Sequence, residues 1–407
     1  MRRKLNIILI AVFLLAILLP VAFMNHNSEK ILETENRVVM KFSDIFGKDD
    51  DDVWGVGARE RTESFLNDNI GFKEFSATAT QASIFELFHY LSDSHLLQGE
   101  DGNLFYSTGS KDTPNSLPPY APVGQDELEK SIQNLSAFND YFESQGIPLL
   151  FCTIPDKENV YPELYPNTFF EKPVISRLAM ISDYVNKNTN IDALDLTAPL
   201  IEAKGDEMLY YASFDPSHWN WKGAFVGYRE IMNRLAEYQE GLVILGEEDL
   251  NIKTEKTEKT LPGSDFILSG YPDTLYTYSL KKAAGKLVDV YGIYGNDTKS
   301  DDAPLSHEKL ADIGYDGICQ YYENDNIADG KKLLIIGDSY INTFFLPYFI
   351  ESYAEVYYIK PPSDSSIIKT MSEAFGPDVV LYELVERTYS WGFDNLVAFN
   401  MLGESDE

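Results

Sequence analysis

The stretch Lys331-Lys-Leu-Leu-Ile-Ile-Gly-Asp-Ser-Tyr340 decides the fold prediction. Its four consecutive apolar residues, 333–336, are typical of a buried strand in a parallel sheet. Gly337-Asp-Ser339 then turns the chain into an apolar segment that begins near Ile341 and predicts a helix. A serine that ends such a strand lies where α/β proteins bind ligands, and its N–H at a helix start can stabilise negative charge. Ser339 is therefore a candidate nucleophile.

Strand and helix patterns alternate on both sides of this stretch. Upstream, the sequence predicts helices over 125–145, 174–189 and 221–239, and strands over 148–154 and 191–196. Downstream, it predicts helices over 341–353 and 366–375, and strands over 355–359 and 379–384. Such alternation is typical of a mostly parallel sheet with right-handed crossovers and helices on both faces. We therefore expect an α/β fold.

Composition suggests how the chain is divided. We expect a polar stalk or lead-in over 25–60, one catalytic domain over 61–395 and a C-terminal tail over 396–407. Within the domain, segment 250–330 breaks the alternation with a Lys/Thr/Glu repeat at 253–260, with glycines and with tyrosines. It predicts an insertion of short strands and loops, without a clear helix, along one side of the cleft.

The N-terminus predicts the compartment. Arg2-Arg-Lys4 precedes the apolar run Ile7–Met24, which is about long enough to cross a bilayer as a helix. The positive charges favour the cytoplasmic side, so the remaining chain is expected outside the cytoplasm. Residues 1–24 are predicted to be a single-pass signal anchor that stays attached. A cleaved signal peptide is the alternative, although the usual cleavage pattern of small residues is missing near Val21-Ala-Phe-Met24.

The charge of the chain limits its partners. The 407 residues include 65 acidic and 33 basic side chains, for a net charge of −32. Nucleic-acid binding needs a basic face, so this class is excluded, and tight binding of a polyanion would need a local charge unlike the total. The acidic run 48–52 lacks the alternation and glycine of a calcium loop, and no zinc spacing occurs, so we expect no metal. Cys152 and Cys319 leave open both a disulfide and two free thiols.

A second segment, Asp215-Pro-Ser-His218-Trp219, supplies what a serine nucleophile needs. A serine hydroxyl reacts at neutral pH only with a base in hydrogen-bond reach, and imidazole has a suitable pKa. A carboxylate must then hold the imidazole and stabilise its charged form. His218 is the one histidine of five with an acid and an aromatic residue at such spacing. Asp215, His218 and Ser339 are therefore predicted to form one catalytic site.

Several motifs, in this order, resemble those of the SGNH-type O-acetyltransferases of bacterial exopolysaccharide modification, which include the periplasmic alginate O-acetylation proteins and the related DHHW proteins. The similar segments are Asn67–Lys73, Leu97–Tyr106, Ile154–Lys157 with Tyr161-Pro-Glu, Asp215–Gly223, Gly337–Ser339 and Val379–Arg387. One departure concerns Asp215. It precedes His218 by three residues, as in SGNH esterases, whereas the alginate-type motif uses two.

The resemblance implies an SGNH-hydrolase-like fold and an acetyl group carried by Ser339. It also implies a membrane-bound O-acyltransferase partner that supplies the acetyl group, so that no cofactor is expected, and a polysaccharide acceptor. For the oxyanion we consider the N–H of Ser339, with Asn342 and Arg387 as further candidates. Asn342 could instead be an ordinary helix-start residue, and Arg387 an ion-pair partner of Glu386 or of another acid.

Three functions remain open at this point. The first is a membrane-anchored, extracytoplasmic O-acetyltransferase that acts on a cell-surface polysaccharide or exopolysaccharide. The second is a carbohydrate esterase or deacetylase with the same three residues, because transfer and hydrolysis differ only in acceptor binding and water exclusion. The third is a glycan-assembly protein without catalysis, in which some of the 26 tyrosines would stack on sugars.

Overall fold

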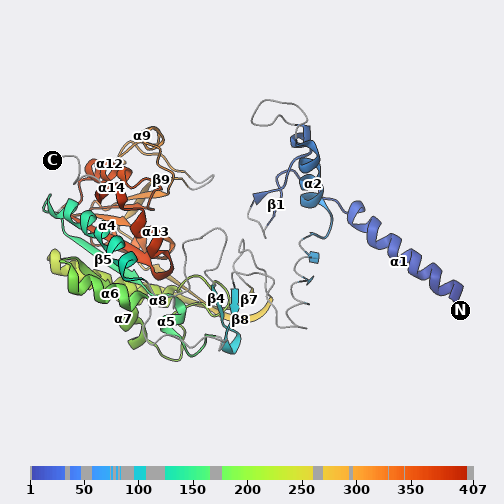
Figure 1. Cartoon of the computed structure of the whole chain (residues 1–407), viewed down its shortest axis with the longest axis horizontal. Coiled ribbons are helices and arrows are strands. Elements are labelled where there is room, and N and C mark those ends of the chain that lie inside the picture. The colour runs from blue at the N-terminus through green and yellow to red at the C-terminus, as the bar shows by residue number, and fades with distance from the viewer. Residues whose placement is uncertain are drawn as a thin grey trace. The chain divides into compact units, whose positions relative to one another are not determined.

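A computed structural model describes residues 2–32, 37–46, 57–73, 75–76, 79–80, 83, 96–106, 124–165, 177–259, 269–292, 297–328, 330–342 and 344–400. Figure 1 shows the chain. It forms two compact units, Met1–Asp93 with Glu258–Pro272, and Ser94–Thr257 with Asp273–Glu407. The domain boundaries expected from the sequence stay predictions. The acidic run 48–52 lies outside the described residues.

In its described residues, the first unit includes the helices α1 and α2 and a small antiparallel strand pair. Its elements are α1 (Arg2–Ala22), β1 (Ile31–Leu32), β2 (Arg37–Val38), a 3-10 helix (Phe42–Phe46) and α2 (Ala58–Asn69). The chain after α1 is joined to the end of α2, because the N–H of Asn25 donates to the carbonyl oxygen of Asn69 at 2.7 Å.

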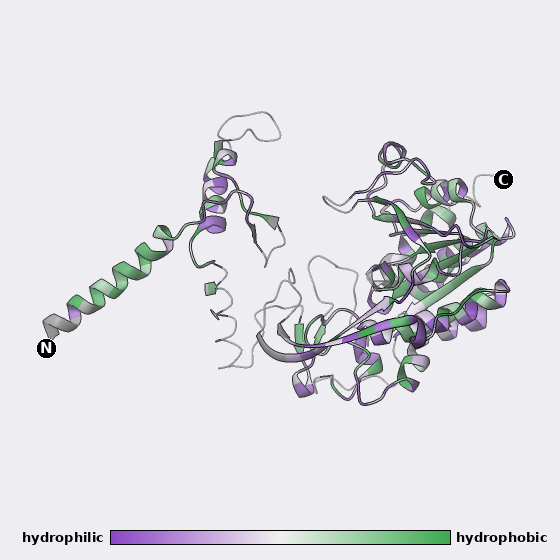
Figure 2. Ribbon diagram, turned by 180° about the vertical axis from the view of Figure 1, so that it is seen from behind, coloured by the Kyte–Doolittle hydropathy of each residue, from purple (hydrophilic) through white to green (hydrophobic). Residues whose placement is uncertain are grey.

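Helix α1 is apolar along most of its length (Figure 2). Nevertheless, none of the helices in the described ranges is both long and apolar enough to span a membrane. The structure therefore does not support the transmembrane anchor expected over 1–24.

The second unit is built on a seven-stranded sheet in the order β6-β5-β13-β11-β12-β10-β9. In this spatial order, the neighbouring strands β6, β5, β13, β11 and β12 are parallel to one another. The strands β10 and β9 then extend the sheet in antiparallel pairing. The mostly parallel α/β sheet expected from the sequence is thus confirmed. The strands are β5 (Leu149–Ile154), β6 (Asp192–Asp195), β9 (Lys286–Tyr291), β10 (Cys319–Glu323), β11 (Lys332–Ile336), β12 (Glu355–Ile359) and β13 (Val379–Val385).

Side chains alternate between two hydrophobic cores, one on each face of the sheet. In β11, Leu333 and Ile335 face one core, and Leu334 and Ile336 face the other. The first core is closed by α7 (Thr197–Glu202), α8 (Trp221–Tyr238), α10 (Ser339–Asn342) and α11 (Leu346–Phe349). The second is closed by α4 (Gln125–Glu143), α6 (Arg177–Asn188), α9 (His307–Asp312), α12 (Ser366–Phe375), α13 (Tyr389–Asp394) and α14 (Val397–Asn400). Burial on both faces explains the continuous apolar runs of the central strands.

The helix predicted over 341–353 is wrong in its extent. The chain forms the short helices α10 and α11 instead, with Pro347 in the first turn of α11. A proline lacks the N–H that a continuous helix would need and its ring crowds the preceding turn, which disfavours one unbroken helix through this position.

Segment 250–330 also differs from its prediction. The strands β7 (Leu250–Lys259) and β8 (Ser269–Leu280) pair with each other, whereas β9 and β10 belong to the main sheet. The expectation that the segment holds no helix is wrong, because α9 begins after Ser306, whose hydroxyl accepts a hydrogen bond from the N–H of Lys309. A serine cap of this kind is a short local signal that composition alone hides.

The described part of the second unit also holds shorter elements, which include the 3-10 helices Glu100–Gly102, Glu247–Asp249 and Glu386–Thr388. The strands β3 (Leu96–Gln98) and β4 (Leu104–Tyr106) pair across a turn with positive φ at Asp101 and Gly102, and α5 (Lys157–Val160) follows β5. Both cysteines are buried and free, so the alternative of two thiols holds.

Candidate active site

Ser339 lies at the carboxyl end of β11, is exposed, and begins α10. The turn before it is tightly held. Asp338 accepts hydrogen bonds from the N–H groups of Tyr340 and Val385, each at 2.9 Å, and its own N–H donates to Glu383 at 3.0 Å. A Cβ at Gly337 would lie 2.7 Å from a carboxyl oxygen of Glu383. The turn thus needs a glycine and presents the serine hydroxyl outward.

The base and the acid come from the loop between the bridged residues Tyr210 and Trp219. Asp215 Oδ1 accepts from the N–H of Ser217 at 3.1 Å and from its hydroxyl at 2.7 Å, which closes a local turn. The turn brings Asp215 Oδ2 to 2.8 Å from His218 Nδ1. The three-residue spacing that departs from the alginate-type motif therefore still allows the contact between the carboxylate and the imidazole.

The structure joins the three predicted residues in one line. His218 Nε2 lies 2.8 Å from Ser339 Oγ, and its other ring nitrogen faces Asp215. When Nδ1 donates to the carboxylate, Nε2 is left as an acceptor for the serine proton. The arrangement has the geometry of a nucleophile, a base and an orienting acid, although catalysis by these residues stays a prediction.

The environment favours a charged Asp215. Burial alone would raise the pKa of this carboxyl, but the hydrogen bonds and charge of His218 and the hydrogen bonds of Ser217 outweigh it and leave the pKa below its usual value. The side chains of His218 and Asp215 are only 16% and 9% exposed. A carboxylate in so little water interacts strongly with an imidazole that takes up a proton.

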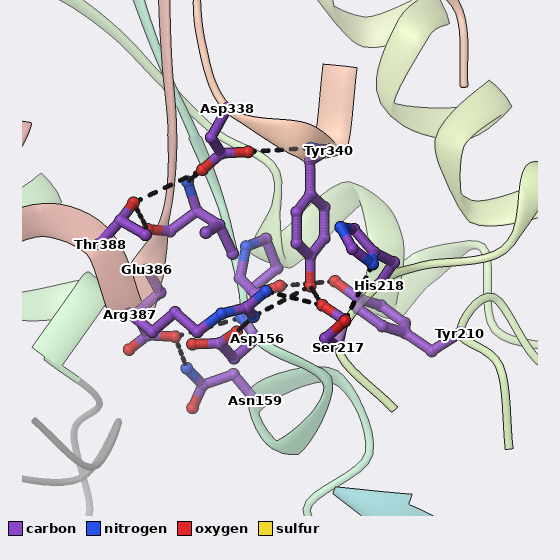
Figure 3. A network of polar contacts seen from close by, with 12 residues as sticks. Asp156, Asn159, Tyr210, Ser217, His218, Asp338, Tyr340, Glu386, Arg387 and Thr388 are labelled. Carbon is purple, nitrogen blue, oxygen red and sulfur yellow. Dashed lines mark hydrogen bonds and ion pairs between the residues drawn. The ribbon is translucent and has the colours of Figure 1, made fainter. Parts of the chain in front are cut away.

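A polar network lies behind the base (Figure 3). Arg387, which follows β13, donates from Nη2 to the carbonyl oxygen of Ser217 at 2.8 Å and from Nη1 to the hydroxyl of Tyr340 at 3.3 Å. Its ion-pair partner is Asp156. The sequence left open whether Arg387 pairs with Glu386 or with another acid, and the structure selects Asp156.

Glu386 is fully buried beside this pair. It accepts from the N–H of Asp156 at 3.3 Å, from the N–H of Leu178 at 3.2 Å and from the side chain of Asn159. Burial raises the pKa of Glu386 to about 8, with the charge of Asp156 as the next cause. Sequence reasoning missed these contacts of Glu386 because its partners belong to α5 with its N-cap and to α6, which are far from it in the sequence.

Lys157 follows β5, and its ammonium group binds backbone carbonyl groups. Its Nζ donates to the carbonyl oxygens of Leu104, Tyr211 and Ala212 at 3.0, 2.8 and 3.0 Å. Burial lowers the pKa of Lys157 to about 7. All three carbonyls belong to backbone near the site, so this residue holds the scaffold.

The remaining oxyanion candidates stay predictions. Asn342 lies one helical turn after Ser339 and is half-buried. Arg387 directs its described hydrogen bonds to Asp156, Tyr340 and Ser217. Among the described residues, no cluster of three or more His, Cys, Asp or Glu side chains could hold a metal ion.

Comparison with known proteins places this arrangement in context. A family model described as "SGNH hydrolase-like domain, acetyltransferase AlgX" matches residues 96–264. The matched part includes Asp215 and His218 and ends before Ser339. No curated protein matches the sequence.

Solved structures share the fold at low sequence identity. The structure of PatB1 from Bacillus cereus is 16% identical, covers 72% of this chain and 96% of its own, and superposes with a TM-score of 0.53. A DHHW family protein from Eubacterium siraeum (20% identity, 74% and 98% coverage, TM-score 0.47) and the O-acetyltransferase domain of Pseudomonas putida AlgJ (15%, 72% and 92%, 0.45) are also similar. The family match confirms the resemblance that the motifs indicate: the chain is similar to the SGNH-type acetyltransferases that the AlgX model describes.

Proposed function

We propose that this protein is an extracytoplasmic O-acetyltransferase that moves an acetyl group through Ser339 onto a polysaccharide hydroxyl. The observation that carries the proposal is the line of 2.8 Å contacts from Asp215 to His218 and from His218 to Ser339. The match to an acetyltransferase domain over 96–264 supports transfer of an acetyl group as the reaction.

The proposed reaction has two halves. In the first, Ser339 Oγ attacks the acetyl carbonyl of the donor, its proton passes to His218 Nε2, and His218 returns this proton to the leaving group. In the second, His218 takes the proton of a sugar hydroxyl, whose oxygen attacks the acetyl-serine. His218 then gives this proton to Ser339 Oγ as the serine ester bond breaks, which restores the free serine and the neutral imidazole. Asp215 holds the ring and stabilises its charged form in both halves. The N–H of Ser339 is the first oxyanion donor, with Asn342 as a further candidate. The described hydrogen bonds of Arg387 go instead to Asp156, Tyr340 and Ser217.

The compartment and the donor are part of the proposal. The order of basic residues and apolar segment at the N-terminus supports placement outside the cytoplasm. Acetyl-CoA is not at hand there, so a membrane-bound O-acyltransferase partner would supply the acetyl group. Fractionating cells that produce the full chain tests this placement. A protein found in the cytosol contradicts it, and presence in the membrane or in the medium separates a retained segment from a cleaved one.

The cellular test uses a strain that lacks this gene. Expression of the wild-type chain should restore acetylation of the polymer, and expression of Ser339→Ala at the same protein level should not. The acetyl content of the purified polymer is the measurement. Normal acetylation with Ser339→Ala would contradict the proposal.

An esterase with the same residues is the second candidate. The exposure of Ser339 favours it, because water can reach the acetyl-serine. Purified protein should be incubated with an acetyl ester, with and without a glycan. Acetylated glycan supports transfer, whereas free acetate in equal amount under both conditions supports hydrolysis.

A further inference from the structure

Tyr340 connects the sequence neighbours of the nucleophile and of the base. Its hydroxyl donates to the carbonyl oxygen of Ser217 at 2.6 Å, and its own carbonyl oxygen accepts from Trp219 Nε1 at 3.2 Å. Ser217 and Trp219 flank His218, and Tyr340 directly follows Ser339. Two hydrogen bonds therefore run beside the contact between His218 and Ser339 and join the same two chain segments.

Arg387 fixes the first of these bonds. The Ser217 carbonyl oxygen receives both Arg387 Nη2 and the Tyr340 hydroxyl, and Arg387 Nη1 contacts the same hydroxyl (Figure 3). Asp156 holds the guanidinium from the other side. Tyr340 and Asp156 are buried, so their polar groups have little water as an alternative partner. These buried hydrogen bonds therefore restrict the position of the Ser217 carbonyl group.

The rest of the loop is held by other charges. Lys157 binds the carbonyls of residues 211 and 212, and the carboxylate of Asp273 accepts from the N–H groups of residues 213 and 214, each at 2.8 Å. Both side chains are buried. The approach to Asp215 is thus anchored from α5 and β8, and Ser217 is the next backbone group held by a charged side chain.

We propose that Tyr340 and Arg387 are positioning residues that hold the Ser217 carbonyl and thereby keep His218 Nε2 within hydrogen-bond reach of Ser339 Oγ. The inference rests on the proposed function, because it assigns the two residues a part in activating Ser339. Neither the Tyr340 hydroxyl nor the Arg387 guanidinium has to touch the reacting atoms. Small errors in the placement of catalytic groups slow a reaction strongly, so loss of the Ser217 contact should be visible in the rate.

The first experiment removes only the hydroxyl, in Tyr340→Phe of the full chain. We expect kcat for a small acetyl ester to fall about 10-fold or more while KM stays within about two-fold, and the rate of Ser339 labelling by a fluorophosphonate to fall in parallel. The matched control is Tyr382→Phe. Tyr382 is equally buried and donates one hydrogen bond, to the Gly392 carbonyl at 3.0 Å, on the opposite face of the sheet. The Tyr382→Phe variant should lose about as much free energy of unfolding as Tyr340→Phe, but its kcat and its rate of Ser339 labelling should stay near those of the wild type.

The second experiment tests Arg387 independently of the tyrosine. In Arg387→Ala, the rate of Ser339 labelling and the rate of ester hydrolysis should fall by about the same factor as in Tyr340→Phe. Added guanidinium ion, at concentrations far below those that denature proteins, should restore a part of both rates. Rescue of this kind is not expected of general destabilisation. If Tyr340→Phe does not fold, the rescue of Arg387→Ala decides the question.

The outcomes separate the inference from the proposed function. Normal labelling of the wild type with unchanged rates in Tyr340→Phe and Arg387→Ala overturns the inference alone. Equal losses in Tyr340→Phe and Tyr382→Phe, without rescue of Arg387→Ala by guanidinium, also overturn it. A wild type whose Ser339 does not react overturns the proposed function, and the inference with it.

Discussion

Asp215 is the residue that orients His218 and stabilises its charged form. Its hydrogen bond to His218 Nδ1 fixes the tautomer that leaves Nε2 free to take the serine proton. In Asp215→Asn the amide can donate to the ring and favour the wrong tautomer, so kcat for acetyl-ester turnover should fall by about 10³-fold or more with little change in KM. Steady-state kinetics at fixed pH measure this.

The matched control for this variant is Asp289→Asn. Asp289 forms a second buried pair, with His307 at 3.1 Å, on the edge strand β9 of the sheet. It should lose stability but retain kcat. Equal losses of activity in both variants would contradict a special role of Asp215.

Glu386 predicts a pH dependence of stability. Burial raises the pKa of this carboxyl from 4.5 to about 8, so between these pH values the folded chain binds a proton that the unfolded chain has released. The stabilisation is therefore complete below about pH 4.5 and is lost as the pH rises toward 8. Urea unfolding of wild type and Glu386→Gln from pH 5 to pH 8 should show a steeper fall for the wild type. Parallel curves would contradict the assignment.

The strand-to-helix turn is the element that presents the nucleophile. Gly337→Ala would place a methyl group 2.7 Å from Glu383, which is buried and cannot swing into solvent. The turn must shift, at about 1–3 kcal/mol in the free energy of unfolding, and the labelling rate of Ser339 should drop with it. Thermal unfolding and fluorophosphonate labelling measure both effects.

Gly205→Ala is the control for this turn. No atom lies within 4 Å of a Cβ built at Gly205, so both quantities should stay near wild type. A Gly337→Ala variant that behaves like Gly205→Ala would show that the turn tolerates a side chain.

The elements also show what the sequence could predict. Apolar runs gave the central strands, because strands covered on both faces lack polar positions, and β12 and α12 match their predicted ranges. Gly337-Asp-Ser339 and Asp215–Trp219 gave the three residues that the structure joins. The break of the helix over 341–353 was readable from Pro347. Long-range contacts such as the ion pair of Asp156 and Arg387 could not be predicted, because nothing local in the sequence relates the residues that follow β5 to those that follow β13.

At the scale of the whole molecule, the net charge of −32 bears on the acceptor. A glycan rich in carboxylates is repelled at long range, and salt screens that repulsion. Acetyl transfer to an acidic oligosaccharide should therefore accelerate as ionic strength rises, whereas transfer to a neutral one of similar length should change by less than about two-fold. An acidic acceptor whose rate falls with added salt would reveal a local positive surface that the total charge conceals.

The central claim is that Ser339 carries the acetyl group and that His218 activates it. Mass spectrometry of the peptide that contains Ser339, after brief incubation of the purified protein with an acetyl ester and acid quenching, tests this directly. We predict the mass of one acetyl group on Ser339 in the wild type, and its loss in His218→Ala and Ser339→Ala. Turnover of the ester without acetyl on Ser339, or equal acetylation of Ser339 in His218→Ala, would contradict the account.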